Sequence, residues 1–434
     1  MPSLNEVVKV KFYGGAEEVG NVRITVEQGG KILCLDYGIK QESEDDAQSF
    51  PKADFIVVSH GHLDHVGNTA YATILNKDTK FIGTETTKRL TSYQLNDILK
   101  IEERRKRENP QAKLSGRPFT LEDILKVENN WMPVKYGEQV DLGAFKVKLY
   151  NAGHIPGSSI IEVKTADKRI IYTGDINLEG NLNKEFPDMD KIEKNPDTLI
   201  IESTYGNQIR DSMDTEEKKF IGYVRDALAA GKNLFIPAFA IERMQRIGYL
   251  LNQIQPSFPD YNFYMVSPSF LKIKDIAYDK LDLSNLIESA RLPNGYKGER
   301  SVVVSTSGFC NGGLSKKILR EIIDNKHYEV IVPSGFLPNS SPIKEALDTG
   351  YIEFIENGIK SKKKVRAKIK QVKLSAHSDL NGLIKIVETI CPDKTSEVYL
   401  VHGEPASQSH LKIKLEGLGY KVNIPKRYDE IAYD

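Results

Sequence analysis

The stretch Ser59-His60-Gly61-His62-Leu63-Asp64-His65 holds four candidate metal ligands, and it directly follows the apolar run 55–58. A short apolar run bounded by polar residues predicts a buried strand, so the ligands come where a strand ends and side chains can converge. Three imidazoles and a carboxylate cost too much free energy to bury together unless a cation holds them. The stretch therefore predicts a metal-binding loop at a strand end.

Three later positions have a similar form, because a His or Asp beside a glycine follows an apolar or alternating run. They are Gly153-His154, Gly174-Asp175 and His402-Gly403. Together with the pattern His-x-His-x-Asp-His, they resemble the signature of the metallo-β-lactamase superfamily. The resemblance implies two Zn²⁺ ions per chain. One would be bound by His60, His62 and His154, the other by Asp64, His65 and His402, and Asp175 would bridge them.

The composition limits what the chain can be. Its 434 residues exceed a usual single domain. Lys+Arg and Asp+Glu both number 60, so any contact with nucleic acid must come from local basic patches. Three cysteines without CxxC spacing argue against a disulfide scaffold or a cysteine zinc site. No apolar run approaches the roughly 20 residues that a spanning helix needs, so we expect a cytoplasmic protein with no membrane partner.

The patterning along the chain changes near residue 209. Before this point, alternating and apolar runs predict strands. After it, helical spacing alternates with short strands, which is typical of a doubly wound α/β insert. We therefore predict a first domain of residues 1–208 and 366–434, interrupted by an insert of residues 209–365. With the superfamily resemblance, the expected fold is α/β: a four-layer αββα sandwich with an inserted α/β domain.

The metal ligands alone do not choose a substrate, because thioesters, lactams and phosphodiesters are all cleaved on this scaffold. Two further features favour a phosphodiester. Glu202 ends an apolar run and His377 lies in Ser-Ala-His-Ser-Asp, and a His held by a carboxylate can protonate a leaving oxygen. The second feature is the insert, which is too large for a β-lactamase or a glyoxalase.

Both features resemble the β-CASP branch of the superfamily, which comprises nucleases built around such an insert. Around Glu202, His377 and His402 the chain is more similar to the cleavage-and-polyadenylation endonuclease and its archaeal relatives than to DNA-repair members, and the RNase J group is close. The resemblance implies a zinc-dependent ribonuclease that hydrolyses single-stranded RNA in RNA processing or decay, as an endonuclease or a 5′-to-3′ exonuclease. Asp64, Glu202 and His377 would be its catalytic residues.

The sequence is consistent with two roles for each of three features: Asp36, the basic segment 360–370 and four residues of the insert. Asp36, in Leu35-Asp36-Tyr37-Gly38, either orients a ligand His from behind or caps a turn. The basic segment 360–370 either lines an RNA path or is a solvated connecting loop. Four residues of the insert either contact RNA phosphates or form plain strand-end turns: Ser307, Gly308, Ser334 and Gly335.

The insert also departs from the motifs that are usual in the β-CASP branch. Glu242 stands where Gly is usual, and Arg246 stands where Glu is usual. The sequence therefore predicts intact metal chemistry with altered substrate binding. The alternatives are a non-catalytic RNA-binding subunit of a processing complex and a DNA nuclease. As partners we expect single-stranded RNA and either a second copy, in a homodimer, or an RNA-processing complex.

Overall fold

The computed structural model describes residues 7–39, 49–108, 118–294, 296, 300–356 and 359–433. The chain forms two compact units, one running up to Ile209 and resuming at Ala376, the other spanning Arg210–Ser375. The return therefore falls after residue 375 rather than after residue 365. The reason is that β19 (Lys368–Gln371) pairs in parallel with β16 (Tyr328–Val332) of the second unit. No helix in the described ranges is long and apolar enough to cross a bilayer.

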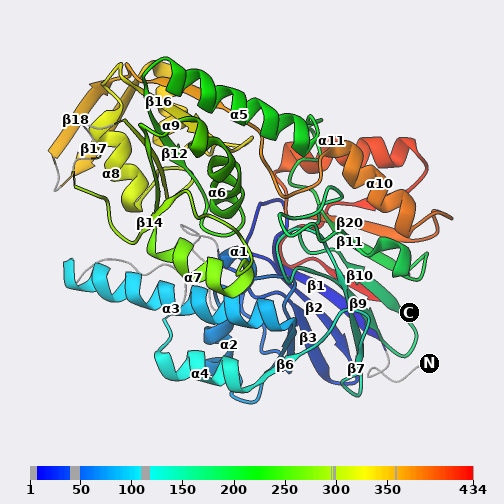
Figure 1. Cartoon of the computed structure of the whole chain (residues 1–434). Helices are drawn as coiled ribbons and strands as arrows, with labels where there is room; N and C mark the ends of the chain where they lie inside the picture. Colours follow the sequence, from blue (N-terminus) through cyan, green and yellow to red (C-terminus); the bar gives the residue numbers. More distant parts are fainter. Residues whose placement is uncertain are drawn as a thin grey trace. The chain divides into compact units, whose positions relative to one another are not determined.

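The first unit contains two seven-stranded sheets (Figure 1). The first sheet has the order β22 (Glu430–Tyr433), β1 (Val8–Gly14), β2 (Arg23–Gln28), β3 (Lys31–Leu35), β4 (Phe55–Val57), β5 (Lys80–Gly83), β6 (Trp131–Pro133). The second has the order β21 (Lys421–Asn423), β20 (Glu397–Val401), β11 (Thr198–Glu202), β10 (Arg169–Tyr172), β9 (Ser159–Lys164), β8 (Lys146–Asn151), β7 (Gln139–Asp141).

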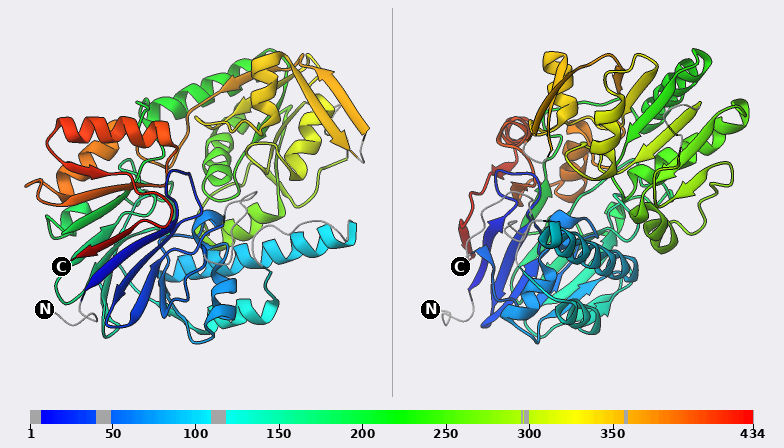
Figure 2. Two further views of the ribbon diagram at one scale, coloured as in Figure 1. Left: turned by 180° about the vertical axis from the view of Figure 1, so that it is seen from behind. Right: turned by 90° about the vertical axis from the view of Figure 1, so that its left-hand side faces the viewer.

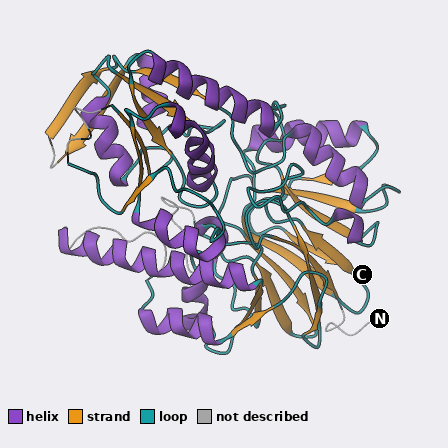
Figure 3. Cartoon of the chain, viewed as in Figure 1, coloured by secondary structure: helices purple, strands orange, loops and turns teal. Residues whose placement is uncertain are grey.

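The two sheets pack face to face, because alternate residues of each strand point to opposite faces. Leu33 and Leu35 of β3 belong to the same central core as Ile200 of β11, whereas Cys34 faces the other way. Each such buried aliphatic side chain stabilises the fold by about 1.5–3 kcal/mol. The outer faces are covered by helices (Figures 2 and 3). These are α1 (Leu63–Val66), α2 (Thr69–Leu75), α3 (Glu85–Glu108) and α4 (Leu121–Asn129) on the first sheet, and α10 (Leu380–Ile390) and α11 (Pro405–Gly417) on the second. The predicted αββα sandwich is confirmed.

The second unit is built on a six-stranded parallel sheet. Its order is β14 (Ile287–Ser289), β13 (Asn262–Val266), β15 (Ser301–Ser305), β12 (Asn233–Pro237), β16, β19. Helices pack on both faces, which confirms the predicted α/β insert. One core includes α5 (Met213–Ala229), α6 (Arg243–Ile254) and α7 (Pro268–Ala277); the other includes α8 (Gly313–Ile322) and α9 (Pro342–Thr349).

The basic segment 360–370 is not a connecting loop, so that reading is wrong. Most of it lies in β18 (Ile359–Lys364) and in β19. β18 pairs antiparallel with β17 (Tyr351–Glu356), and Ile352 and Phe354 of β17 bury their side chains in the insert's core. The partner strand therefore supplies the apolar face that the lysine-rich strand lacks.

Candidate metal centre

The loop that carries the first candidate ligands is fixed by backbone hydrogen bonds to the residue before β2 and to the segment after β3. Val22 N–H donates to Asp64 O (3.0 Å), and Tyr37 N–H donates to His65 O (2.8 Å). Gly38 lies so close to this loop that a Cβ atom would stand 1.7 Å from Asp64 O, so no other residue fits there. The strand end, the short helix α1 and this contact together hold the ligand loop in one conformation.

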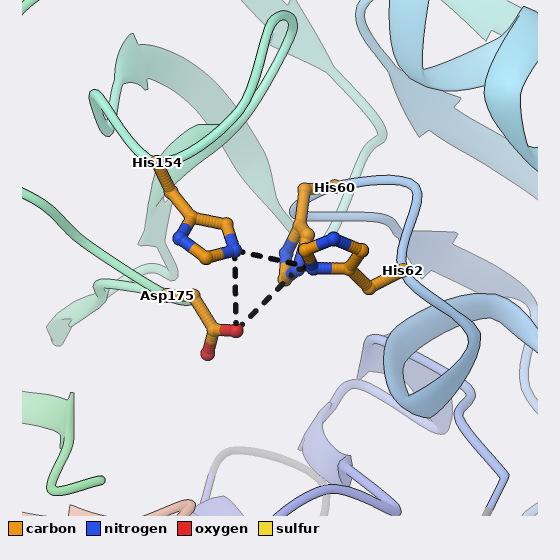
Figure 4. A group of neighbouring side chains, drawn as sticks. All are labelled: His60, His62, His154 and Asp175. Carbon is orange, nitrogen blue, oxygen red and sulfur yellow. Dashed lines mark hydrogen bonds and ion pairs between the residues drawn. The ribbon is translucent and has the colours of Figure 1, made fainter. Parts of the chain in front are cut away.

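The first ligand group comprises His60, His62, His154 and Asp175 (Figure 4). Nδ1 of His62 lies 3.0 Å from Nε2 of His60 and 3.2 Å from Nε2 of His154. Oδ2 of Asp175 lies 3.4 Å from Nε2 of His60 and 3.6 Å from Nε2 of His154. Bond lengths of 2.0–2.1 Å in a tetrahedral zinc site place ligand atoms about 3.3 Å apart, which matches this spacing.

The second group comprises Asp64, His65 and His402. Oδ2 of Asp64 lies 3.2 Å from Nε2 of His402 and 3.9 Å from Nε2 of His65. Oδ1 of Asp175 reaches the same group, at 3.5 Å from Nε2 of His65. The two oxygens of Asp175 therefore face different ligand groups, which is the arrangement that a bridging carboxylate requires.

Hydrogen bonds from behind orient the rings of His60, His154 and His402. Nδ1–H of His154 donates to Ala376 O (2.7 Å), and Nδ1–H of His60 donates to Ser59 Oγ (3.0 Å). In His402, Nδ1 lies 3.0 Å from Thr204 Oγ1. These partners turn Nε2 of each of the three rings toward the other candidate ligands.

Asp36 lies behind His65 at the end of β3. Its Oδ2 accepts from Nδ1–H of His65 (2.6 Å), from Ser59 Oγ (2.7 Å) and from Tyr172 OH (2.8 Å), and its Oδ1 accepts from Ser59 N–H (2.6 Å). Of the two roles that the sequence predicts for Asp36, the contact with His65 favours that of an orienting residue. The sequence does not predict the supporting contacts of Ser59, Tyr172 and Thr204, although Ser59 stands directly before His60.

Two observations test whether a cation fits here. Nε2 of His65 and Oδ1 of Asp175 are buried and have no hydrogen-bond partner among the described residues. Burial lowers the pKa of His60 and His154, and that of His62 to about 4, so these three rings are neutral at pH 7. Neutral imidazoles and an orphaned carboxylate oxygen are the donor set that zinc takes. The residues therefore fit a divalent metal.

The second group has the opposite electrostatic character. Burial lowers the pKa of His402, but the carboxylates of Asp175 and Asp64 more than offset this and raise it to about 9. Burial also lowers the pKa of His65, but the carboxylates of Asp175 and Asp36 outweigh burial and raise this pKa well above its ordinary value. The carboxylates thus demand positive charge at these rings, which a divalent cation would supply.

Beside the ligands, Glu202 and His377 form a hydrogen-bonded pair. Nδ1 of His377 lies 2.9 Å from Oε1 and 3.0 Å from Oε2 of Glu202, and Nε2 lies 3.8 Å from Oδ2 of Asp175. Glu202 is buried at the end of β11, where its Oε1 also accepts from Ile176 N–H (2.9 Å). Burial lowers the pKa of His377, but the Glu202 carboxylate outweighs it and raises the pKa. The Glu202 carboxylate therefore favours the protonated form of the ring, which faces the ligand cluster.

The four candidate phosphate contacts all lie in the second unit. Ser307 Oγ donates to Gly312 O (3.3 Å), and Ser334 Oγ donates to Phe336 O (2.7 Å). Both hydroxyls thus stabilise turns at the ends of β15 and β16. Gly308 and Gly335 lie in the same two turns. RNA contact by these four residues stays a prediction.

Comparison with known proteins finds two family models, one matching each end of the chain. Residues 18–184 match the model of the metallo-beta-lactamase superfamily domain, and residues 362–425 match the Zn-dependent metallo-hydrolase RNA specificity domain. A crystal structure of a protein of unknown function from Enterococcus faecalis V583 has the same fold, with a TM-score of 0.59 and 14% identity. That similarity covers 98% of this chain and 100% of that one.

Relatives of known name are similar over nearly the whole chain. The RNase J-like protein of Methanocaldococcus jannaschii is 31% identical, over 92% of this chain and 93% of its own. RNase aCSPSF2 of Saccharolobus solfataricus is 29% identical, over 98% of this chain and 85% of its own. Integrator complex subunit 11 of Danio rerio is 27% identical, over 94% and 71%. The chain belongs to the β-CASP metallo-β-lactamase ribonucleases, the family of these archaeal cleavage-factor-like and RNase J-like enzymes.

Proposed function

We propose that this protein is a zinc-dependent ribonuclease that hydrolyses phosphodiester bonds of single-stranded RNA. The observation that carries the proposal is the meeting of seven ligand side chains with the Glu202–His377 pair. Six of these ligands lie between residues 60 and 175, and the seventh, His402, lies in the segment that follows the insert. RNA as the substrate is supported by the names of the relatives and by the RNA specificity domain at 362–425.

Two Zn²⁺ ions are proposed as the cofactors, one in each ligand group with Asp175 between them. Such a pair supplies a nucleophile from water near neutral pH and stabilises negative charge on phosphoryl oxygens. The protein's own contribution is to hold the donor atoms in place. The supports behind His60, His65, His154 and His402 keep the ligand rings from turning, so little reorganisation is needed when a substrate arrives.

His377 is proposed as the general acid. The leaving oxygen of a ribose is a poor leaving group unless it receives a proton, and positioned proton donors accelerate such steps by about 10²–10⁴-fold. Nδ1–H of His377 donates to Glu202, and in the imidazolium form that this carboxylate favours, Nε2–H is the second proton and faces the cluster. His377 also keeps 19% of its side-chain surface exposed, which leaves a substrate oxygen room to approach.

The proposal includes work within an RNA-processing complex. Two similar proteins are named as subunits of such assemblies, Integrator complex subunit 11 and cleavage and polyadenylation specificity factor subunit 3. The mode of cleavage, internal or from the 5′ end, is decided by the substrate test below.

The test offers zinc-loaded protein three labelled RNAs and one matched DNA. The RNAs carry a 5′ monophosphate, carry a 5′ triphosphate, or are circular. Cleavage of circles identifies an endonuclease, and mononucleotides from the 5′-monophosphate strand alone identify an exonuclease. Asp175→Ala should abolish cleavage, whereas His410→Ala, on α11 and outside both ligand groups, should not. Cleavage of the DNA alone, or full activity of Asp175→Ala, would refute the proposal.

A further inference from the structure

The insert's parallel sheet has a topological switch point between its central strands, β12 and β15. The chain leaves β12 through α6 toward β13 on one side, and leaves β15 through α8 toward β16 on the other. α6 packs on one face of the sheet and α8 on the opposite face. In open α/β sheets, ligands bind beyond the carboxyl ends of the strands at such a point.

Three phenylalanines occupy the loops at this edge. Phe239 follows β12, Phe309 follows β15 and Phe336 follows β16. The ring centroids of Phe239 and Phe309 are 4.7 Å apart, and those of Phe309 and Phe336 are 6.2 Å apart. Phe239 and Phe336 nevertheless expose 37% and 40% of their surface. Adjoining exposed aromatic rings cost free energy in water, and such patches mark sites that bind a partner or a ligand. We call these three residues the aromatic cluster.

The loops around the aromatic cluster are fixed by contacts among themselves. A Cβ atom on Gly308 would come within 3.0 Å of the Phe239 ring, so the ring lies directly on the glycine backbone. Ser341 Oγ donates to Phe309 O (2.9 Å), and Ser315 N–H donates to Thr306 O (2.8 Å). The rings are therefore held in place before a ligand arrives, which reduces the entropy lost on binding.

The chemistry around the aromatic cluster favours a base attached to a polyanion. Lys316 and Lys317 lie in the first half of α8, which begins at the same edge of the sheet as the aromatic cluster, and no acidic residue lies between Ser305 and Lys317. Glu242, the acidic residue after β12, is buried and engaged by Arg243 and Arg246. Flat apolar rings beside positive charge are the components with which proteins stack the bases of single strands without reading sequence.

We propose that the aromatic cluster at the β12–β15 switch point stacks a base of single-stranded RNA. This inference rests on the proposed function for its choice of ligand, and it adds a binding site that lies wholly within the insert. Ring–base stacking contributes enough affinity that losing one ring should weaken RNA binding about tenfold.

The test measures RNA binding by the full chain, stripped of metal so that no strand is cut. Fluorescence anisotropy gives Kd for a short single-stranded RNA and for the same strand with abasic sugars. Phe309→Leu and Phe336→Leu keep an apolar side chain but remove the π face. Phe336→Tyr keeps the ring, and Tyr249→Leu removes an exposed ring on α6 outside the aromatic cluster. Thermal unfolding verifies that each variant is folded.

We expect both Leu variants to bind the ordinary RNA about tenfold more weakly, with Phe336→Tyr and Tyr249→Leu unchanged. On the abasic strand all proteins should bind alike, because there is no base to stack. Equal Kd values for wild type and Leu variants would overturn the proposal, as would an altered oligomeric state with unchanged RNA affinity. RNA cleavage is scored separately with zinc. Ring-dependent binding without cleavage would refute only the proposed function, and cleavage without ring dependence only the stacking site.

Discussion

Asp36 lies behind the loop of candidate ligands and contacts two of its residues, Ser59 and His65. Its carboxylate accepts four hydrogen bonds, including those of His65 and Ser59, without touching the predicted metal positions. Asp36→Asn keeps the shape but offers an NH₂ group in place of an acceptor oxygen. We expect metal affinity to fall about 10–100-fold, as for other residues that orient ligands.

Competition with a fluorescent zinc chelator measures this affinity. Tyr172→Phe is the matched control, because it removes one of the same hydrogen bonds and leaves the carboxylate in place. Tyr172→Phe should lose much less zinc affinity than Asp36→Asn. If Asp36→Asn held zinc as tightly as wild type, the orienting role would be wrong.

Two substrates with different leaving groups distinguish the proposed role of His377 from that of the metal ligands. His377→Gln should slow RNA cleavage about 10²–10⁴-fold, because the leaving ribose oxygen loses its proton donor. A nitrophenyl phosphodiester releases nitrophenolate, which leaves without a proton, so its hydrolysis should fall far less. Initial rates on both substrates, with zinc content measured on the same samples, check this. Equal losses on both substrates would instead indicate a disturbed metal centre.

At the scale of elements, helix α6 begins in an unusual way. Glu242, its N-cap residue, has φ = 71°, a left-handed conformation that favours glycine. Its carboxylate pairs with Arg246 one turn later (2.5 Å). The β-CASP branch usually has Gly at the position of Glu242 and Glu at the position of Arg246. This chain thus accepts a strained backbone and places its acid at the start of the helix rather than within it.

The buried Glu242–Arg246 pair predicts a pH-dependent stability. Burial would raise the pKa of Glu242, but Arg246 and Arg243 outweigh it and lower the pKa. The pair's contribution is therefore complete above the ordinary Glu pKa of about 4.3 and is lost as pH falls through the lower, folded-state pKa. Glu242→Gln should cost about 3 kcal/mol at pH 7.

Urea unfolding of wild type and Glu242→Gln, both free of metal, tests this. The difference in free energy of unfolding should narrow as the pH is lowered below 4. A difference that stays constant with pH would mean that packing or backbone strain, rather than charge, determines the cost of the substitution.

The sequence predicted most of the elements that carry ligands, because each ligand follows an apolar run that ends at a sheet edge. Asp175 after β10 and His402 after β20 are examples. It did not predict β18, whose lysines show no apolar alternation; the apolar face belongs to Ile352 and Phe354 of its partner strand. Contacts such as Thr204 with His402 join residues far apart in the chain, and no local pattern encodes them.

At the scale of the whole molecule, all seven ligands and the Glu202–His377 pair belong to one of the two compact units. Metal binding should therefore stabilise that unit selectively, by about 4 kcal/mol at a zinc concentration a thousand times the Kd. Hydrogen exchange with and without zinc, read by mass spectrometry, checks this. We expect protection in peptides from residues 49–108, 139–209 and 376–433. Equal protection of β12 and β15 would contradict a local effect.

The path of the chain has a consequence for synthesis on the ribosome. His377 and His402 follow the insert, and β20, which leads to His402, lies next to β11 in the second sheet. A nascent polypeptide that has not yet emerged past the insert holds the histidine-rich loop but lacks both His377, the proposed proton donor, and His402. We therefore expect a translation product that ends before His377 to be inactive, because both candidate residues would be missing.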